Sequence, residues 1–278
     1  MKQIKLASLL GAISLFAAAP ASASVIGGVD FGALGESPSN IHLETATLAQ
    51  QIVTGNGQNS TAYGFITSVN GNTNYCASGN CSLYYVAEFN NSQNYSTSYV
   101  EFANSTVTLY YADSSNINLL GQSSAANLAY ITGLSTWVTL TGHNNLGGVA
   151  DPSAVVNATG LFAGDTLTFT GNGLLDVNSA AAGEADVKAF LDANRITDAV
   201  GGKADIAFTS SANDDILNPF DNTSSCGTGT PTAGQWCFQG TSNIRGNTVT
   251  ATVPEPATLA LLAAGLGMLG FARKVKQA

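Results

Sequence analysis

The stretch Ser82–Asn90, SLYYVAEFN, decides the fold. Successive side chains of a β-strand point to opposite faces, so this stretch separates into two sets of residues. One set is Leu83, Tyr85, Ala87 and Phe89, and the other is Ser82, Tyr84, Val86 and Glu88. Apolar residues alternating over such a length are typical of a half-buried antiparallel strand.

Similar runs recur along the chain and are separated by residues that favour turns. They cover residues 41–49, 61–69, 106–113, 134–141, 165–170, 203–210 and 248–253. Glycine and asparagine, which accept a positive φ, cluster at 54–57, 70–72 and 171–173. Many short strands at such intervals predict an all-β protein, an antiparallel β-sandwich with jelly-roll or Ig-like connections.

One segment has helical periodicity instead. In GEADVKAFLDANRI, residues 183–196, Val187, Phe190 and Leu191 form an apolar stripe. Glu184 and Asp186 fall in the first turn, where the helix dipole favours acidic groups. We therefore expect one short helix packed on the sheet.

The charge of the central region excludes one class of partner. Residues 24–253 contain four basic and 17 acidic side chains, which gives a net charge of −13. No Lys or Arg occurs between Lys5 and Lys188. Such a surface cannot neutralise phosphates, so we expect no nucleic-acid partner.

Four cysteines form two close pairs in the sequence. Cys76 and Cys81 flank a turn-like Ala-Ser-Gly-Asn, and Cys226 precedes Cys237 by 11 residues. In an exported chain an even number of cysteines indicates disulfides, and of the three possible connectivities the local one is the simplest. Zinc is the alternative, but no histidine supports it.

The N-terminus is typical of a secretory signal peptide, residues 1–23. Lys2 and Lys5 precede an apolar stretch, and Ala21 and Ala23 form the small-residue pattern that signal peptidase reads before Ser24. We therefore expect an extracellular β-sandwich domain over residues 24–253.

The C-terminus, residues 254–278, has three parts. Pro254, Glu255 and Pro256 precede 16 uncharged residues, and a basic cluster follows at 273–276. The apolar run favours a short transmembrane helix with the basic residues inside and the folded domain outside. This layout resembles the PEP-CTERM sorting signal. The resemblance implies that an exosortase of a Gram-negative, exopolysaccharide-producing bacterium recognises Pro254, Glu255 and Pro256 and processes a transiently membrane-anchored protein.

Candidates for catalysis are few. His42 and His143 are isolated, and neither a G-x-S-x-G nor an H-E-x-x-H motif occurs. We therefore expect that the protein is not an enzyme. A glycoside hydrolase needs only two carboxylates, so Glu44, Glu88 and Glu101 keep a carbohydrate-active protein as the alternative.

An acidic segment, ANDDILNPFDN, offers hard oxygen ligands at Asp214, Asp215 and Asp221. It is either a solvated loop or a calcium site. No other cofactor is expected.

Three aromatic residues, Tyr84, Tyr110 and Trp137, fall on the polar face of their strands. Exposed aromatic rings stack on sugar rings, so we expect these three to contact extracellular polysaccharide, unless a loop or a second sheet covers them.

A shorter stretch, AFLDANRITDAVGGKADIAFTSS at residues 189–211, is similar to flocculation-associated PEP-CTERM proteins. The resemblance implies a structural or adhesive role in biofilm or floc formation. We expect the protein at the cell surface or in the extracellular matrix, with a secreted carbohydrate-binding or carbohydrate-active protein as the alternative.

Overall fold

The computed structural model describes residues 24–32, 41–114, 118–215, 220, 226 and 230–246. Predictions about the signal peptide, the strand at 248–253 and the sorting tail lie outside these residues. No helix in the described ranges is long and apolar enough to cross a membrane.

Nine strands form one large sheet, in which every described pairing is antiparallel. They are β3 (Ile41–Gln51), β4 (Ser60–Val69), β5 (Ser82–Ser96), β6 (Tyr99–Ala112), β7 (Ser135–Gly142), β8 (Val156–Leu161), β9 (Thr168–Val177), β12 (Ile206–Asn213) and β13 (Trp236–Gly246). Two short hairpins are formed by β1 (Val25–Ile26) with β2 (Val29–Asp30) and by β10 (Ile196–Thr197) with β11 (Lys203–Ala204).

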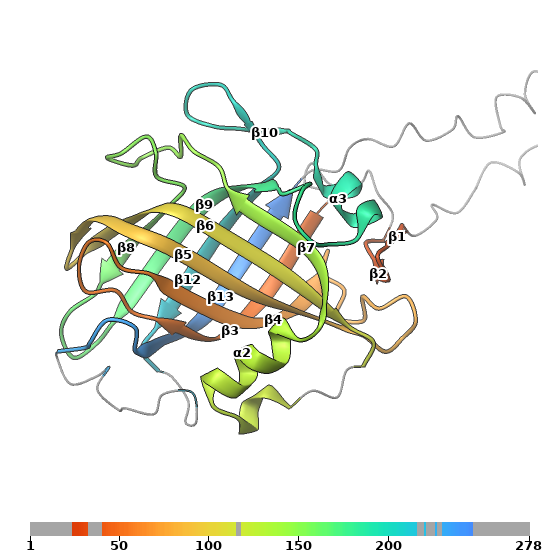
Figure 1. Cartoon of the computed structure of the whole chain (residues 1–278), viewed down its shortest axis with the longest axis horizontal. Coiled ribbons are helices and arrows are strands. Elements are labelled where there is room, and N and C mark those ends of the chain that lie inside the picture. Colours follow the sequence, from red (N-terminus) through yellow and green to blue (C-terminus); the bar gives the residue numbers. More distant parts are fainter. Residues whose placement is uncertain are drawn as a thin grey trace, which may run out of the picture. The chain divides into compact units, whose positions relative to one another are not determined.

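The large sheet closes on itself (Figure 1). Strands run in the order β12-β13-β3-β4-β5-β6-β7-β9, and β12 also pairs with β9 over eight residues, from Ile206–Leu175 to Asn213–Thr168. Strand β8 bridges the first residues of β6 to β9, where β7 and β9 are paired at only three positions. The all-β prediction is confirmed, but the sheet is a closed, eight-stranded, barrel-like structure rather than a clear sandwich.

The physical reason is the pairing between β9 and β12. A sandwich leaves its two sheets unpaired along their edges, whereas here hydrogen bonds continue around the whole circuit. Closure removes the exposed edges that an open sheet would present. Alternation in the sequence shows which residues share a face, but it is the same for both architectures.

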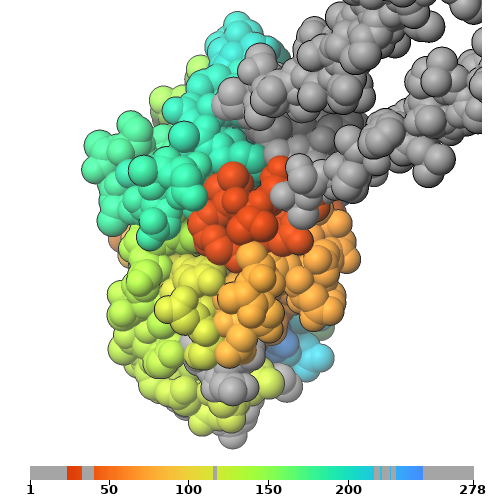
Figure 2. All heavy atoms as spheres, turned by 90° about the vertical axis from the view of Figure 1, so that its right-hand side faces the viewer, coloured from red at the N-terminus to blue at the C-terminus, as the bar shows by residue number. Residues whose placement is uncertain are grey.

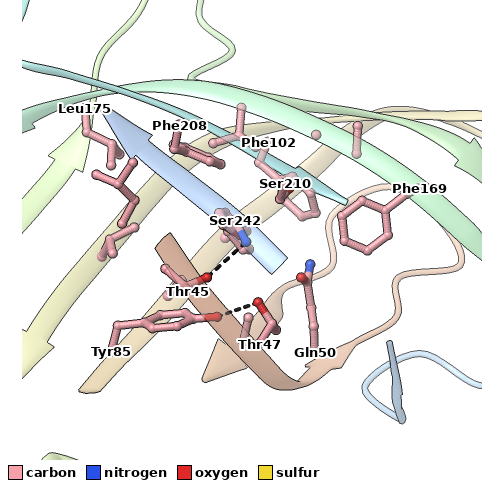
Figure 3. Close-up of a pocket in the computed structure, with 18 of the residues that line it drawn as sticks. Thr45, Thr47, Gln50, Tyr85, Phe102, Phe169, Leu175, Phe208, Ser210 and Ser242 are labelled. Carbon is pink, nitrogen blue, oxygen red and sulfur yellow. Dashed lines mark hydrogen bonds between the residues drawn. The ribbon is translucent and has the colours of Figure 1, made fainter. Parts of the chain in front are cut away.

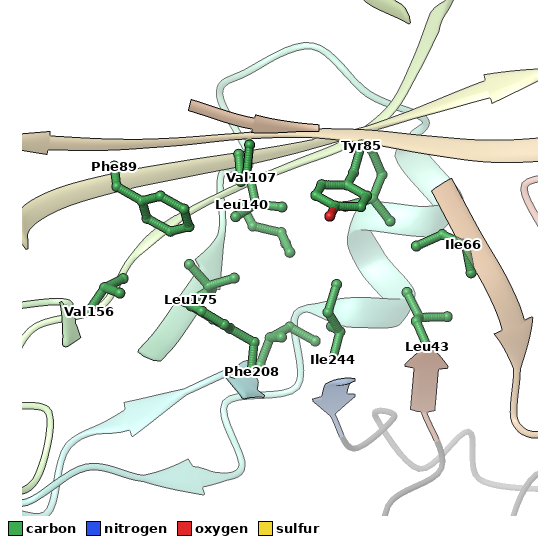
Figure 4. Close-up of a cluster of buried hydrophobic side chains, with 14 of the residues drawn as sticks. Leu43, Ile66, Tyr85, Phe89, Val107, Leu140, Val156, Leu175, Phe208 and Ile244 are labelled. Carbon is green, nitrogen blue, oxygen red and sulfur yellow. The ribbon is translucent and has the colours of Figure 1, made fainter. Parts of the chain in front are cut away.

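The main core fills the interior of this barrel (Figure 4). Tyr85 and Phe89 of β5 point inward from one wall, and Leu175 and Phe208 approach from the opposite wall. An eight-stranded barrel is just wide enough for its side chains to fill. Tyr85 and Phe89 belong to the apolar set that alternation assigns in residues 82–90, whereas Leu175 lies outside the predicted runs.

A second apolar cluster covers part of the outer wall. Helix α2 (Ser124–Thr132), which follows a short 3-10 turn η2 (Leu119–Gly121), lies outside β4 and β5 (Figure 1). Its Ile131 is fully buried with Tyr63, Tyr84 and Phe220. The sequence analysis did not predict α2, although Ser123 caps it by accepting the Ala126 N–H.

The N-terminal hairpin packs at one end of the barrel (Figure 2). Phe31 lies between the ring of Trp137, at 6.3 Å, and that of Phe190, at 4.8 Å between centroids. Phe190 belongs to α3 (Ala185–Leu191), so the predicted helix is confirmed. Trp137 Nε1 also donates a hydrogen bond to the Gly27 carbonyl at 2.9 Å. Residues 24–32 and α3 thus cover this end of the apolar core.

Candidate functional site

The barrel interior contains a small cavity with two kinds of wall (Figure 3). One side is polar: Thr45 Oγ1 accepts the Ser242 N–H, and Thr47 Oγ1 lies 2.5 Å from the Tyr85 hydroxyl. The other side is aromatic, with Phe102, Phe169 and Phe208. Burial raises the pKa of Tyr85 to about 12, although its bonds to Thr47 and Thr45 oppose the shift. This phenol therefore stays neutral at physiological pH.

The size of this cavity limits what it can hold. Its volume is about 50 Å³, whereas ligand pockets typically enclose ~300–1,000 Å³. Room remains for a few water molecules beside the polar wall. The interior is therefore a packed core with a polar patch, and a ligand of ordinary size would require it to rearrange.

A larger hollow, of about 630 Å³, lies across β8, β9, β12 and β13. In Figure 1 these strand ends lie at the end of the barrel opposite the N-terminal hairpin. The lining is Thr159, Gly160, Thr168, Phe169, Thr170, Ser211, Ala212, Asn213, Gln239, Gly240 and Thr241. None of these side chains is ionisable. We call this hollow the hydroxyl groove.

The pairing register explains the composition of the hydroxyl groove. Thr170 lies opposite both Thr159 and Ser211, and Ser211 also lies opposite Thr241, so a row of four hydroxyls crosses the strands. One residue pair further along the strands lie Gly160, Phe169, Ala212 and Gly240. Apart from Phe169, whose ring is buried in the core, these residues are small. By alternation these residues face the barrel interior, as Phe169 does, so it is their backbone that borders the hydroxyl row on the outer face.

A second cluster joins strand β9 to two loops near the opposite strand ends. His143 Nδ1 lies 2.8 Å from Asp176 Oδ2, and Nε2 lies 3.2 Å from Asp198 Oδ2. Burial lowers the pKa of His143, but the hydrogen bonds and charges of the two carboxylates outweigh burial and raise it. With a carboxylate on each ring nitrogen, the imidazole cannot take a proton from a substrate. This arrangement fits a structural cross-link better than a general base.

Glu101, a candidate carboxylate for hydrolysis, is fully buried. Its Oε1 accepts hydrogen bonds from the Tyr99 hydroxyl and the Ala150 N–H, and its Oε2 accepts them from Asn94 Nδ2 and the Asp151 N–H. Burial raises the pKa of this carboxyl, but the four bonds outweigh burial and lower it. Glu101 therefore anchors the loop before β8 and is not accessible to a substrate.

The other two candidate carboxylates lie on separate strands. Glu44 of β3 is exposed and accepts a hydrogen bond from the Ser68 hydroxyl at 2.8 Å. Glu88 of β5 is also exposed and lies opposite Thr61 and Thr106. His42 lies 3.0 Å from Asn243 Oδ1. None of the carboxylates that the sequence analysis singled out lines the hydroxyl groove.

The predicted row of exposed aromatic residues is wrong. Trp137 is fully buried beneath residues 24–32, and Tyr84 is 4% exposed. Tyr110 is partly buried in the cluster under α2. Alternation placed Tyr84 and Tyr110 correctly on the outer face, but α2 covers that face. These three residues therefore offer no common surface for stacking on sugars.

Both predicted disulfides are confirmed, Cys76–Cys81 and Cys226–Cys237. Of the proposed calcium ligands, Asp214 Oδ2 accepts the Leu167 N–H at 2.9 Å, and the Asp215 N–H donates to Asn213. Asp221 lies outside the described residues. In the described ranges, no group of three or more His, Cys, Asp or Glu side chains is close enough to hold a metal ion. Calcium binding stays a prediction.

The sequence analysis missed both the hydroxyl groove and the histidine cluster. The groove residues of β9 and β12 fall within or beside predicted strands, but β8 and β13 were not predicted, and the rows follow only from the register. His143 is 33 residues from Asp176 and 55 from Asp198, and no local motif links them. Residues 21, 23, 24 and 254–256 were predicted as processing sites, and of these only Ser24 is within the described residues.

Comparison with known proteins identifies one segment of the chain. Residues 252–277 match the family model of the PEP-CTERM protein-sorting motif. No curated protein and no solved structure matches the chain. The match includes Pro254, Glu255 and Pro256 and confirms the resemblance drawn from those residues. The chain therefore carries a PEP-CTERM sorting motif and is an exported protein that an exosortase processes and sorts to the cell surface.

Proposed function

We propose that this protein is a structural, adhesive component of the exopolysaccharide matrix at the surface of a Gram-negative bacterium, where it acts in biofilm or floc formation. The observation that carries the proposal is the sorting motif at residues 252–277, joined to a disulfide-linked barrel. Export to the surface brings such a barrel into contact with secreted polymer.

The environments of the side chains that could act as acids or bases support a non-enzymatic role. Both ring nitrogens of His143 are bound to carboxylates, and Glu101 is buried with four donors. The hydroxyl groove offers hydrogen bonds but no acid or base. We accordingly favour a binding role over glycoside hydrolysis, which requires a pair of carboxylates flanking the substrate.

We also propose that the protein works without a cofactor other than, in one testable case, a bound calcium ion. If Asp214, Asp215 and Asp221 hold calcium, a chelator will lower the Tm of the exported protein, and added calcium will restore it. An unchanged Tm would show that the protein does not depend on calcium, and the proposed matrix role would still stand.

The test of the matrix role is deletion of the gene in its own host. We expect the deletion strain to aggregate less and to retain less polymer on its cells, and the full-length gene to restore both. A variant gene lacking residues 254–278 should restore neither, because its product is not sorted. Normal aggregation and polymer retention in the deletion strain would overturn the proposal.

A further inference from the structure

The hydroxyl groove is formed by side chains whose hydrogen-bonding groups are largely free. Within the described residues, Thr168, Ser211 and Thr241 make no side-chain hydrogen bond. Thr159 and Thr170 bond only to each other, at 3.3 Å between their hydroxyl oxygens. Gln239 Oε1 is buried and lacks a hydrogen-bond partner, which is costly unless a ligand or water supplies a donor.

The floor of the groove beside the hydroxyl row is strand backbone, because the residues next to the row face the barrel interior. A Cβ atom added to Gly240 would lie 2.0 Å from the Ser211 carbonyl oxygen, so this position cannot carry a side chain without moving the backbone. The backbone of Ala212 on β12 and of Gly160 on β8 also lines the groove. An extended ligand could therefore lie across the strands, against the backbone and beside the hydroxyl row.

The chemistry of the lining selects the ligand class. With no cation in the lining, the groove cannot neutralise a phosphate or a carboxylate, and the acidic protein repels polyanions. Its only large apolar side chain, Phe169, is 6% exposed, so an acyl chain or an apolar peptide face would find little contact area. Free hydroxyl and amide groups match a polymer that is itself uncharged and rich in hydroxyls.

The spacing of the row favours a repeating ligand. Neighbouring strands lie about 4.8 Å apart, so the row presents a hydroxyl at each such step, close to the length of one sugar ring. We propose that the hydroxyl groove binds an extended, neutral polysaccharide lying across β8, β9, β12 and β13. This inference deepens the proposed matrix role and rests on it. The site is distinct from Tyr84, Tyr110 and Trp137.

Affinity electrophoresis of the exported protein tests this site. The gels contain hydroxyethyl cellulose, the neutral polysaccharide fraction from the host, or alginate as a polyanion. We expect retardation in a neutral gel and none in alginate. The double variant Ser211→Ala with Thr241→Ala should bind the neutral polymer about tenfold more weakly, a change of about 1.4 kcal/mol. A double variant with exposed residues away from the groove, Thr73→Ala with Ser135→Ala, should migrate like the unmodified protein.

Ser211→Tyr provides an independent check, because a tyrosine is compatible with an exposed strand position but would obstruct the groove. Far-UV circular dichroism establishes that each variant is folded. The inference is overturned if neither neutral polymer retards the protein, if alginate retards it equally, or if both double variants lose binding alike. If the gene deletion abolishes aggregation while groove variants bind normally, the matrix role survives and only the assignment of the groove fails.

Discussion

The Nε2 atom of His143 lies 3.2 Å from Oδ2 of Asp198, in the loop between β10 and β11. On the opposite side of the ring, Asp176 of β9 approaches Nδ1. The Ala199 N–H also donates to the Asn145 carbonyl at 3.0 Å, so the two loops contact each other through backbone as well as side chains. His143 thus links the wall of the barrel to the β10–β11 hairpin.

We predict that His143→Gln lowers the Tm by about 2–4 °C, the range expected for losing a modest interaction in a domain of this size. Glutamine cannot present two charged donors to Asp176 and Asp198. The control is His42→Gln, since the His42 ring is also partly exposed but hydrogen-bonds the uncharged Asn243 and lies 3.9 Å from a single carboxylate, that of Glu44. Equal thermal shifts in the two variants would contradict a specific role for the cluster.

The same cluster gives the unmodified protein a pH dependence. The raised pKa of His143 means that its contribution to stability is complete below its ordinary value of 6.5 and is lost as pH rises through the folded-state value. For Asp198, burial raises the pKa, but the bonds from His143, Val200 and Gly202 outweigh burial and lower it. Its contribution is present above 3.8 and is lost as pH falls through the folded-state value.

We therefore expect the difference in Tm between the unmodified protein and His143→Gln to be largest between about pH 4 and 6.5, and smaller on either side. Thermal denaturation across this range measures it. A difference that does not vary with pH would show that the imidazole contributes packing alone.

Glu101 provides a sharper test of buried polarity. Each carboxylate oxygen accepts one backbone N–H, from Ala150 or from Asp151. In Glu101→Gln, whichever position carries the NH₂ group would face one of those N–H donors. We predict a loss of about 1–3 kcal/mol in the free energy of unfolding, measured by urea denaturation, because a buried donor is left unpaired.

The matched control is Glu88→Gln, which makes the same change at an exposed position of the neighbouring strand β5. Its free energy of unfolding should change by less than about 0.5 kcal/mol. If Glu101→Gln changed the free energy of unfolding equally little, the Glu101 carboxylate would not be needed to hold the loop before β8.

The N-terminal hairpin depends on a close approach at Gly27. This residue has a φ of +53°, and an added Cβ would lie 2.4 Å from both Trp137 Nε1 and Val187 Cγ2. We predict that Gly27→Ala displaces the hairpin and exposes Trp137, seen as a red shift of tryptophan emission and a stability loss of about 1–3 kcal/mol beyond the backbone strain.

Gly32→Ala supplies the backbone strain without the clash. Gly32 has a φ of +73°, but nothing lies within 4 Å of the position its Cβ would take. An equal red shift in both variants would mean that positive φ alone, and not contact with Trp137, keeps the hairpin in place.

Local patterns in the sequence were sufficient for most strands of the sheet, the helix α3 and the disulfides, but β8 and β13 lie outside every predicted run. Alternation around Tyr85 is a property of one strand, and Cys76 and Cys81 are close along the chain. Closure could not be predicted, because it depends on β12 pairing with β9 on one side and β13 on the other. Pairing between distant segments depends on the whole packed structure, and the alternation within one strand does not indicate which strand it pairs with.

The candidate sites failed for a related reason. Alternation placed Tyr84 on the outer face, but whether that face is exposed depends on α2, which lies about 40 residues along the chain. Thr159, Thr170, Ser211 and Thr241 form a row only once the registers of four strands are known. A sequence pattern predicts which residues share one face of a strand, whereas a binding site also requires the residues of several strands or helices that the fold brings together.

The C-terminal motif yields a prediction that does not depend on the barrel. We predict that Pro254→Ala with Pro256→Ala prevents processing by the exosortase, because both prolines lie within the matched sorting motif. Intact-mass spectrometry should show a product that retains residues 254–278 and fractionates with membranes, whereas the unmodified protein is recovered shortened. Pro152→Ala with Pro231→Ala, both outside the motif, should be processed normally. Shortening of the motif variant to the same mass as the unmodified protein would show that another protease removes the tail.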